Sequence, residues 1–218
     1  MIAENNIVIQ SAGGAPVSNL YIRAAQPGRR LVVIFPGGNY TCERPLLRYA
    51  TNAALQTGYD AVNLRYYCQG SGQSYEDGPD VRRQIIRDSA AVLRECLRAC
   101  DYEKISFVSK SIGTVLAGEV SLLFPERDIS NFFLTPLAET IPFITKSPCT
   151  VAAGDRDWAL SAADIARIRE LPGVTVRIIP DVGHSLEKDD DCLYSLAVLT
   201  DVTRMLLGFY EARAGRRT

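Results

Sequence analysis

One serine of this chain lies in a setting that favours nucleophilic chemistry. Ser111 is the centre of Ser109-Lys110-Ser111-Ile112-Gly113, between an apolar run that predicts a buried strand over 105–108 and one that predicts a helix. A serine that protrudes from a tight strand-to-helix turn needs small residues two positions away on either side, because larger side chains would collide there. The first N–H groups of the helix can stabilise developing negative charge. Ordinary loops contain the same pattern, so the assignment of Ser111 as a nucleophile depends on finding a base and an acid for it.

The candidate base is His184, the only histidine of the chain. A lone histidine is usually a surface residue or a hydrogen-bonded core residue. Here it follows the last predicted strand, 174–179, in Gly183-His184-Ser185. A serine hydroxyl is a poor nucleophile near neutral pH and needs a base whose pKa lies near that pH. If Ser111 is a nucleophile, His184 must therefore be its base.

Two carboxylates compete for the third role, which is to orient the imidazole ring and stabilise its charged form. Asp155 and Asp157 both follow the predicted strand 149–153 in Gly154-Asp155-Arg156-Asp157. An aspartate beside a glycine commonly forms a turn or caps a helix, which is the alternative interpretation of Asp155. The residues alone leave both candidates open.

Strands and helices alternate along most of the chain. Residues 7–10 and 19–23 predict an antiparallel hairpin, and 30–35, 61–66, 105–108, 129–134, 149–153 and 174–179 predict further strands. Helices are expected over 45–56, 79–100, 112–124, 161–171 and 192–213. This order predicts a single domain over 1–218, with a mostly parallel sheet covered by helices on both faces. Candidate groups then meet at the carboxyl ends of the strands.

Nearly the whole chain resembles the α/β-hydrolase superfamily in the order of its elements. The Ser111 turn is similar to the nucleophile elbow of that superfamily, with Ser109 in place of the first glycine. The order serine, acid, histidine also agrees. The resemblance implies Asp157 as the acid through a Gly-x-x-Asp pattern, and it implies no cofactor and no metal. It looks like a small, lidless member near the dienelactone-hydrolase-like proteins and small carboxylesterases, since no insertion is long enough for a cap domain.

A glycine-rich turn follows the strand 30–35. Pro36-Gly37-Gly38-Asn39-Tyr40 is similar to the His-Gly-Gly-Gly motif of many esterases and lipases. The resemblance implies that backbone N–H groups of Gly38 and Asn39 join that of Ile112 in an oxyanion hole. A plain strand-to-helix turn is the alternative.

These features predict a serine hydrolase that cleaves a small carboxylic ester. A thioesterase, a small peptidase, a lyase and a non-catalytic ligand-binding protein of the same fold remain alternatives. Residues at predicted strand ends could line the pocket, although aromatic groups there are as often packing groups. They are Tyr40, Cys42, Tyr66, Tyr67, Gln69 and Trp158.

Composition narrows the remaining classes. The chain has 24 basic and 25 acidic residues, a formal net charge of −1, and no basic patch of the kind that binds nucleic acid or anionic membranes. No signal peptide is expected, and no apolar run approaches the roughly 20 residues that span a bilayer. Six scattered cysteines without a CxxC motif or Cys/His cluster indicate reduced thiols, hence a cytoplasmic protein. The oligomeric state and the natural substrate cannot be predicted.

Overall fold

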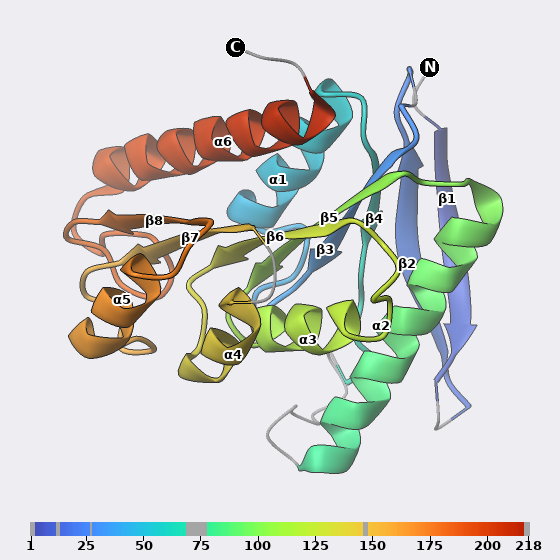
Figure 1. Ribbon diagram of the computed structural model, residues 1–218, viewed down its shortest axis with the longest axis horizontal. Helices are drawn as coiled ribbons and strands as arrows, with labels where there is room; N and C mark the ends of the chain where they lie inside the picture. Colours follow the sequence, from blue (N-terminus) through green and yellow to red (C-terminus); the bar gives the residue numbers. More distant parts are fainter. Residues whose placement is uncertain (1–2, 12–13, 27, 69–77, 146–147, 216–218) are drawn as a thin grey trace.

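The computed structural model describes residues 3–11, 14–26, 28–68, 78–145 and 148–215, and within them eight strands form one sheet (Figure 1). The strand order is β1-β2-β4-β3-β5-β6-β7-β8. The strands are β1 (Ala3–Gln10), β2 (Pro16–Arg23), β3 (Arg30–Phe35), β4 (Asp60–Asn63), β5 (Lys104–Lys110), β6 (Ile129–Leu134), β7 (Cys149–Gly154) and β8 (Val174–Ile179). The predicted mostly parallel sheet with an N-terminal antiparallel hairpin is confirmed.

Strand pairing aligns the carboxyl ends of the central strands. β1 and β2 pair antiparallel, β2 pairs antiparallel with β4, and every neighbouring pair from β4 to β8 is parallel. In the centre, Phe35 of β3 is level with Ser109 of β5, and Lys110 of β5 is level with Leu134 of β6. The loops that follow these strands therefore leave the same edge of the sheet.

Helices cover both faces of the sheet, as expected. In Figure 1, α1 (Pro45–Gln56) and α6 (Cys192–Ala214) lie on one face, while the other helices lie on the opposite face. Those are α2 (Pro79–Ala99), α3 (Ile112–Ser121), α4 (Ile141–Ile144) and α5 (Ala162–Arg169). Side chains alternate between the faces along β3: Leu31 and Val33 belong to the core under α2 and α3, whereas Val32 belongs to the core under α1 and α6.

Two segments differ from the sequence prediction. The strand expected over 61–66 ends at Asn63, after which the chain leaves the sheet and the Tyr66 hydroxyl donates to the Pro36 carbonyl at 3.0 Å. The connection expected to be irregular over 135–146 contains a short 3₁₀ helix, η2 (Ala138–Thr140), followed by α4. Pro142 lies in the first turn of α4, where a missing N–H costs no helical hydrogen bond. These short helices do not make a cap domain.

Helix α6 corrects the expectation about membrane-spanning segments. It has 23 residues and is apolar enough, by length and composition, to cross a membrane. It packs on the sheet face through the buried residues Val198, Val202, Leu206 and Tyr210. Its sequence also carries an exposed Asp201–Arg204 ion pair at 2.8 Å. Length and composition alone are weak evidence for a span.

Candidate active site

Ser111 occupies a strained turn between β5 and α3. Its φ of 54° and ψ of −126° are rare for a residue with a side chain. The Ser111 N–H donates to the Leu134 carbonyl at 3.1 Å, which ties the turn to β6. A Cβ at Gly113 would lie 2.4 Å from the Pro36 carbonyl oxygen, so only glycine lets α3 start this close to the end of β3. The small residues around Ser111 therefore have a steric cause.

The structure brings Ser111, His184 and Asp157 into one chain of hydrogen bonds. His184 Nε2 lies 2.8 Å from Ser111 Oγ, and His184 Nδ1 lies 2.8 Å from Asp157 Oδ1. The Asp157 carboxylate is fully buried, while the His184 side chain keeps 20% of its surface exposed. Asp157 Oδ1 also accepts the Ala159 N–H at 2.9 Å. A carboxylate held in this way can keep the imidazole in one tautomer, with Nε2 facing the hydroxyl.

Geometry separates the two aspartates that the sequence left open. The end of β7 lies directly against the loop that carries His184. A Cβ at Gly154 would lie only 2.0 Å from the Val182 carbonyl oxygen, so this close approach requires glycine. Asp157 points from the loop after β7 to the imidazole, whereas Asp155 is exposed and its backbone N–H donates to Ile179 at 2.9 Å. Only Asp157 contacts His184.

Three backbone N–H groups lie at the same cavity as Ser111. Ile112 is the first residue of α3, where helical N–H groups have no acceptor within the helix. Gly38 and Asn39 line the cavity too, and within the described ranges neither N–H has a hydrogen-bond acceptor. The neighbouring Gly37 N–H instead donates to the Tyr40 carbonyl at 2.9 Å. The residues predicted for an oxyanion hole thus line the same cavity as Ser111, and their N–H groups have no acceptor among the described residues.

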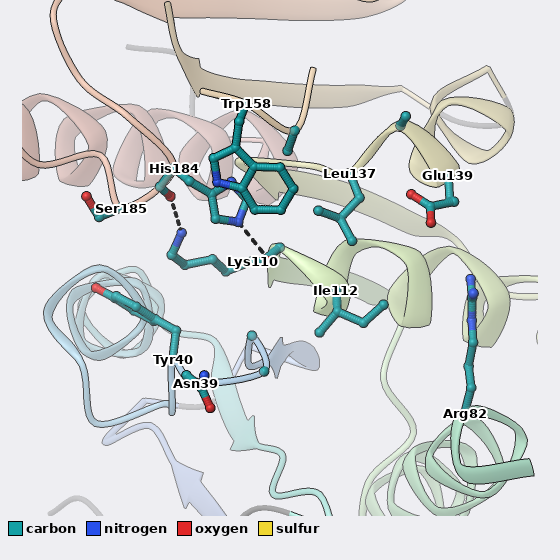
Figure 2. A pocket seen from close by; sticks show the side chains of 15 residues that line it. Asn39, Tyr40, Arg82, Lys110, Ile112, Leu137, Glu139, Trp158, His184 and Ser185 are labelled. Carbon is teal, nitrogen blue, oxygen red and sulfur yellow. Dashed lines mark hydrogen bonds between the residues drawn. The ribbon is translucent and has the colours of Figure 1, made fainter. Parts of the chain in front are cut away.

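The cavity has a volume of about 760 Å³ and opens to solvent beside the hydrogen-bonded chain. Figure 2 shows Tyr40 and Trp158 on the side of His184, with Ile112 and Leu137 as apolar lining. Farther along, Arg82 of α2 and Glu139 of η2 place opposite charges at the other end. The site therefore has an apolar middle and a charged rim.

The predicted lining is partly wrong. Tyr66 is buried and its hydroxyl donates to the Pro36 carbonyl, and Tyr67 packs against the core under α2 and α3. Cys42 is buried too, and its thiol faces the Leu64 carbonyl at 3.4 Å. Tyr66 and Tyr67 follow the end of β4, and neither they nor Cys42 line the cavity. Gln69 lies outside the described residues.

Sequence reasoning missed Lys110, Arg82, Leu137, Glu139 and Ser185, which also line the cavity. Lys110 lies inside the serine motif itself, so its position next to Ser111 was a usable signal. The other residues come from α2, from η2 and the segment before it, and from the His184 loop. Their approach to Ser111 depends on tertiary packing.

The described part of the chain contains no group of three or more His, Cys, Asp or Glu side chains that could hold a metal ion. Burial raises the pKa of the Cys96 thiol and of the Cys149 thiol to about 12, which keeps both protonated near neutral pH. Ser111 is the nucleophile candidate that also has a base within hydrogen-bond distance.

This strand order, with a serine turn after β5 and the acid and histidine after β7 and β8, defines the α/β-hydrolase fold. Comparison with solved structures gives the same fold at low sequence identity. An esterase of Pyrococcus furiosus has a TM-score of 0.72 and 14% identity, with 97% of this chain and 93% of that chain covered. A Xanthomonas campestris serine hydrolase without a lid has a TM-score of 0.69 and 16% identity, with 96% and 94% covered.

A third similar structure is a protein of Butyrivibrio proteoclasticus with ferulic acid bound. Its TM-score is 0.74 at 14% identity, and the match covers 96% of this chain and 99% of that chain. No protein-family model matches the chain, and no curated protein matches it.

Proposed function

We propose that this protein is a serine hydrolase that cleaves small carboxylic esters, with Ser111 as nucleophile, His184 as general base and acid, and Asp157 as the group that orients His184. One observation carries the proposal: the only histidine of the chain has Nε2 2.8 Å from the hydroxyl of the strained Ser111. A serine at positive φ costs free energy and persists where the surroundings hold it. The buried Asp157 on the other ring nitrogen supports the same assignment.

The proposed reaction has two halves. His184 Nε2 takes the proton from Ser111 Oγ as that oxygen bonds to the carbonyl carbon of the ester. The carbonyl oxygen becomes an oxyanion, and the N–H groups of Ile112, Gly38 and Asn39, which line the cavity, are proposed to stabilise it. The carbon–oxygen bond to the alcohol breaks, and the leaving oxygen receives the proton from His184. Water then attacks the acyl-enzyme with His184 again as base, which releases the acid and restores Ser111.

The open cavity, with its apolar middle of moderate size, fits a small acyl substrate. Two of the similar structures are described as an esterase and as a protein with bound ferulic acid, an aromatic carboxylic acid. Those descriptions concern proteins at 14% identity, so they support the ester class without identifying the acyl group.

The test is covalent labelling with a fluorophosphonate probe, which reacts with activated serines. We expect the wild-type protein to be labelled, Ser111→Ala to lose labelling, and the control Ser121→Ala, at the other end of the same helix, to keep it. A panel of esters, thioesters and amides with matched acyl groups then ranks the substrate classes. Absent labelling of the folded wild-type protein contradicts the proposal and favours a ligand-binding protein.

A further inference from the structure

Lys110 is a buried cation that the Ser111–His184–Asp157 chain does not use. Its side chain is only 2% exposed, although it directly precedes Ser111. Burying an ammonium group costs free energy unless hydrogen bonds or an opposite charge replace its water. Within the described ranges no carboxylate lies within ion-pair distance of it. Its place in the core therefore depends on hydrogen bonds.

The ammonium links three parts of the site. Lys110 Nζ donates to the backbone carbonyl of His184 at 2.7 Å and to the hydroxyl Oγ1 of Thr135 at 2.8 Å. Figure 2 shows the amine directed at the main chain of His184, beside the ring of Tyr40. The distance from Nζ to the centre of that ring is 5.0 Å, which adds a cation–π contact. One side chain thus connects the ends of β5 and β6 to the histidine loop.

The His184 backbone has few other attachments. The flanking loop is held by the hydrogen bond from Leu186 N–H to Gly183 at 3.1 Å and that from Arg156 N–H to Val182 at 3.1 Å. Among the described residues, the Lys110 hydrogen bond is the one that holds a main-chain atom of His184 itself. This bond therefore adds a main-chain anchor to the contacts that Asp157 and Trp158 make with the imidazole ring.

Thr135 provides independent evidence that this arrangement is under strain. Its φ is 45°, a conformation that β-branched residues rarely adopt and that costs free energy. The Thr135 N–H is held by the Ala152 carbonyl at 2.7 Å, and its hydroxyl accepts from Lys110. The surroundings thus hold Thr135 in a costly conformation that presents an acceptor to the ammonium.

We propose that Lys110 is a positioning residue: its ammonium fixes the main chain of His184 to the ends of β5 and β6, so that Nε2 stays within hydrogen-bond distance of Ser111 Oγ. The kinetic consequences rest on the proposed hydrolase function, whereas the position of the imidazole does not. Lys110 Nζ contacts the His184 carbonyl and Thr135 instead of the serine, so it does not act as the base.

The charge of Lys110 is sensitive to pH in a useful range. Burial lowers its pKa to about 8, while the negative charges of Asp157 and Glu187 act in the opposite direction. Among the described residues, His184 and Tyr40 also face it, and burial raises the pKa of the Tyr40 phenol. As pH rises through about 8, Lys110 loses its charge and one donor proton. An arginine stays protonated throughout this range.

The experiment compares Lys110→Met and Lys110→Arg with a matched control, Lys104→Met. Lys104 begins the same strand that Lys110 ends, and its amine also donates to a backbone carbonyl, that of Arg213, at 2.9 Å, far from the site. We expect Lys110→Met to lower kcat by about 10- to 100-fold through misplacement of the imidazole, with a much smaller change in KM. Lys104→Met should keep wild-type kinetics.

Two further readouts separate positioning from stability. Because His184 is the only histidine, its ring nitrogen and proton signals in NMR spectra report the imidazole directly. They should shift in Lys110→Met and not in Lys104→Met, at temperatures where melting curves show both folded. Wild-type kcat should fall as pH rises through about 8, and Lys110→Arg should remove that fall.

Wild-type kcat together with unchanged His184 signals in Lys110→Met would overturn the proposal. If Lys110→Met does not fold, Thr135→Val takes its place, with a smaller loss of kcat and a smaller shift of the same signals expected, and unchanged values overturning the proposal. A wild-type protein without hydrolysis or labelling would refute the proposed function alone. The His184 signals of the variants would still decide the role of Lys110.

Discussion

The indole ring of Trp158 lies against the imidazole ring of His184, with ring centroids 4.9 Å apart and an angle of 38° between the ring planes. Trp158 is the only tryptophan, directly follows Asp157 in the chain, and is 77% exposed. The indole of Trp158 therefore shields one face of the His184 imidazole from water. The contact joins the only tryptophan of the chain to its only histidine.

This contact predicts an optical reporter of the site. An imidazole in contact with an indole alters the environment of the indole, so replacing His184 should change the emission of Trp158. The measurement is the tryptophan emission spectrum of the wild-type protein and of His184→Asn at one pH, with Asp155→Asn as a control that keeps the ring contact. An unchanged spectrum in His184→Asn would contradict this prediction.

The proposed nucleophile and base should act as one unit. Ser111→Ala and His184→Ala should each lower kcat by about 10⁴- to 10⁶-fold, and the double variant by hardly more. The reason is that the hydroxyl and Nε2, 2.8 Å apart, contribute to the same proton transfer. Steady-state kinetics of the three variants provide the test. Either single variant within tenfold of wild type would remove its residue from the assignment.

Asp157 and Asp155 form a matched pair of carboxylates on one loop. Asp157→Asn should leave the fold intact and strongly reduce kcat, because an amide next to Nδ1 favours the wrong imidazole tautomer. Asp155→Asn should change neither, since Asp155 is exposed and does not contact His184. The measurements are kcat and melting temperature of both variants. A large loss of kcat in Asp155→Asn alone would reverse the assignment.

Burial of Lys110 predicts a pH dependence of stability. Its folded pKa of about 8 lies below the 10.5 of an exposed lysine, so between these values the unfolded chain binds more protons. The free energy of unfolding therefore gains a contribution that rises with pH through this window, by at most about 1.4 kcal/mol per pH unit. Urea unfolding of wild type and Lys110→Met from about pH 7 to about pH 10 should show wild type gaining relative to the variant. A constant difference would mean that Lys110 titrates normally.

The short helices η2 and α4 beside the cavity predict an open site without interfacial activation. A lid that opens at a lipid surface needs an amphipathic insertion, and this connection provides only 3 residues in η2 and 4 in α4. We expect a preference for short, soluble acyl esters and no jump in rate when a substrate passes its solubility limit. Rates for a short and a long ester across their aggregation points test this. A sharp rise above aggregation would show that a segment closes over the site.

The sequence alone determined the order of the elements and the residues at their ends. The strands Arg30–Phe35 and Ile129–Leu134 have the predicted bounds in the structure. In the first, residues 31–35 form the continuous apolar segment that a strand buried on both faces needs. The same patterns placed Ser111, the two aspartates and His184 after successive strands. Local sequence was sufficient to predict where these residues lie, since turns and helix caps depend on neighbouring residues.

Tertiary structure alone decided which of these groups meet. Asp157 and Asp155 differ by two positions, and only the close approach of the β7 and β8 loops at Gly154 turns one of them toward His184. In the sequence, Lys110 resembles an ordinary polar residue of a turn. Only the tertiary structure shows that the end of β6 and the histidine loop enclose its amine. Tyr66 follows the end of β4 and donates to the Pro36 carbonyl instead of lining the cavity. Contacts between segments far apart in the chain depend on how the sheet twists and packs, which local sequence patterns do not encode.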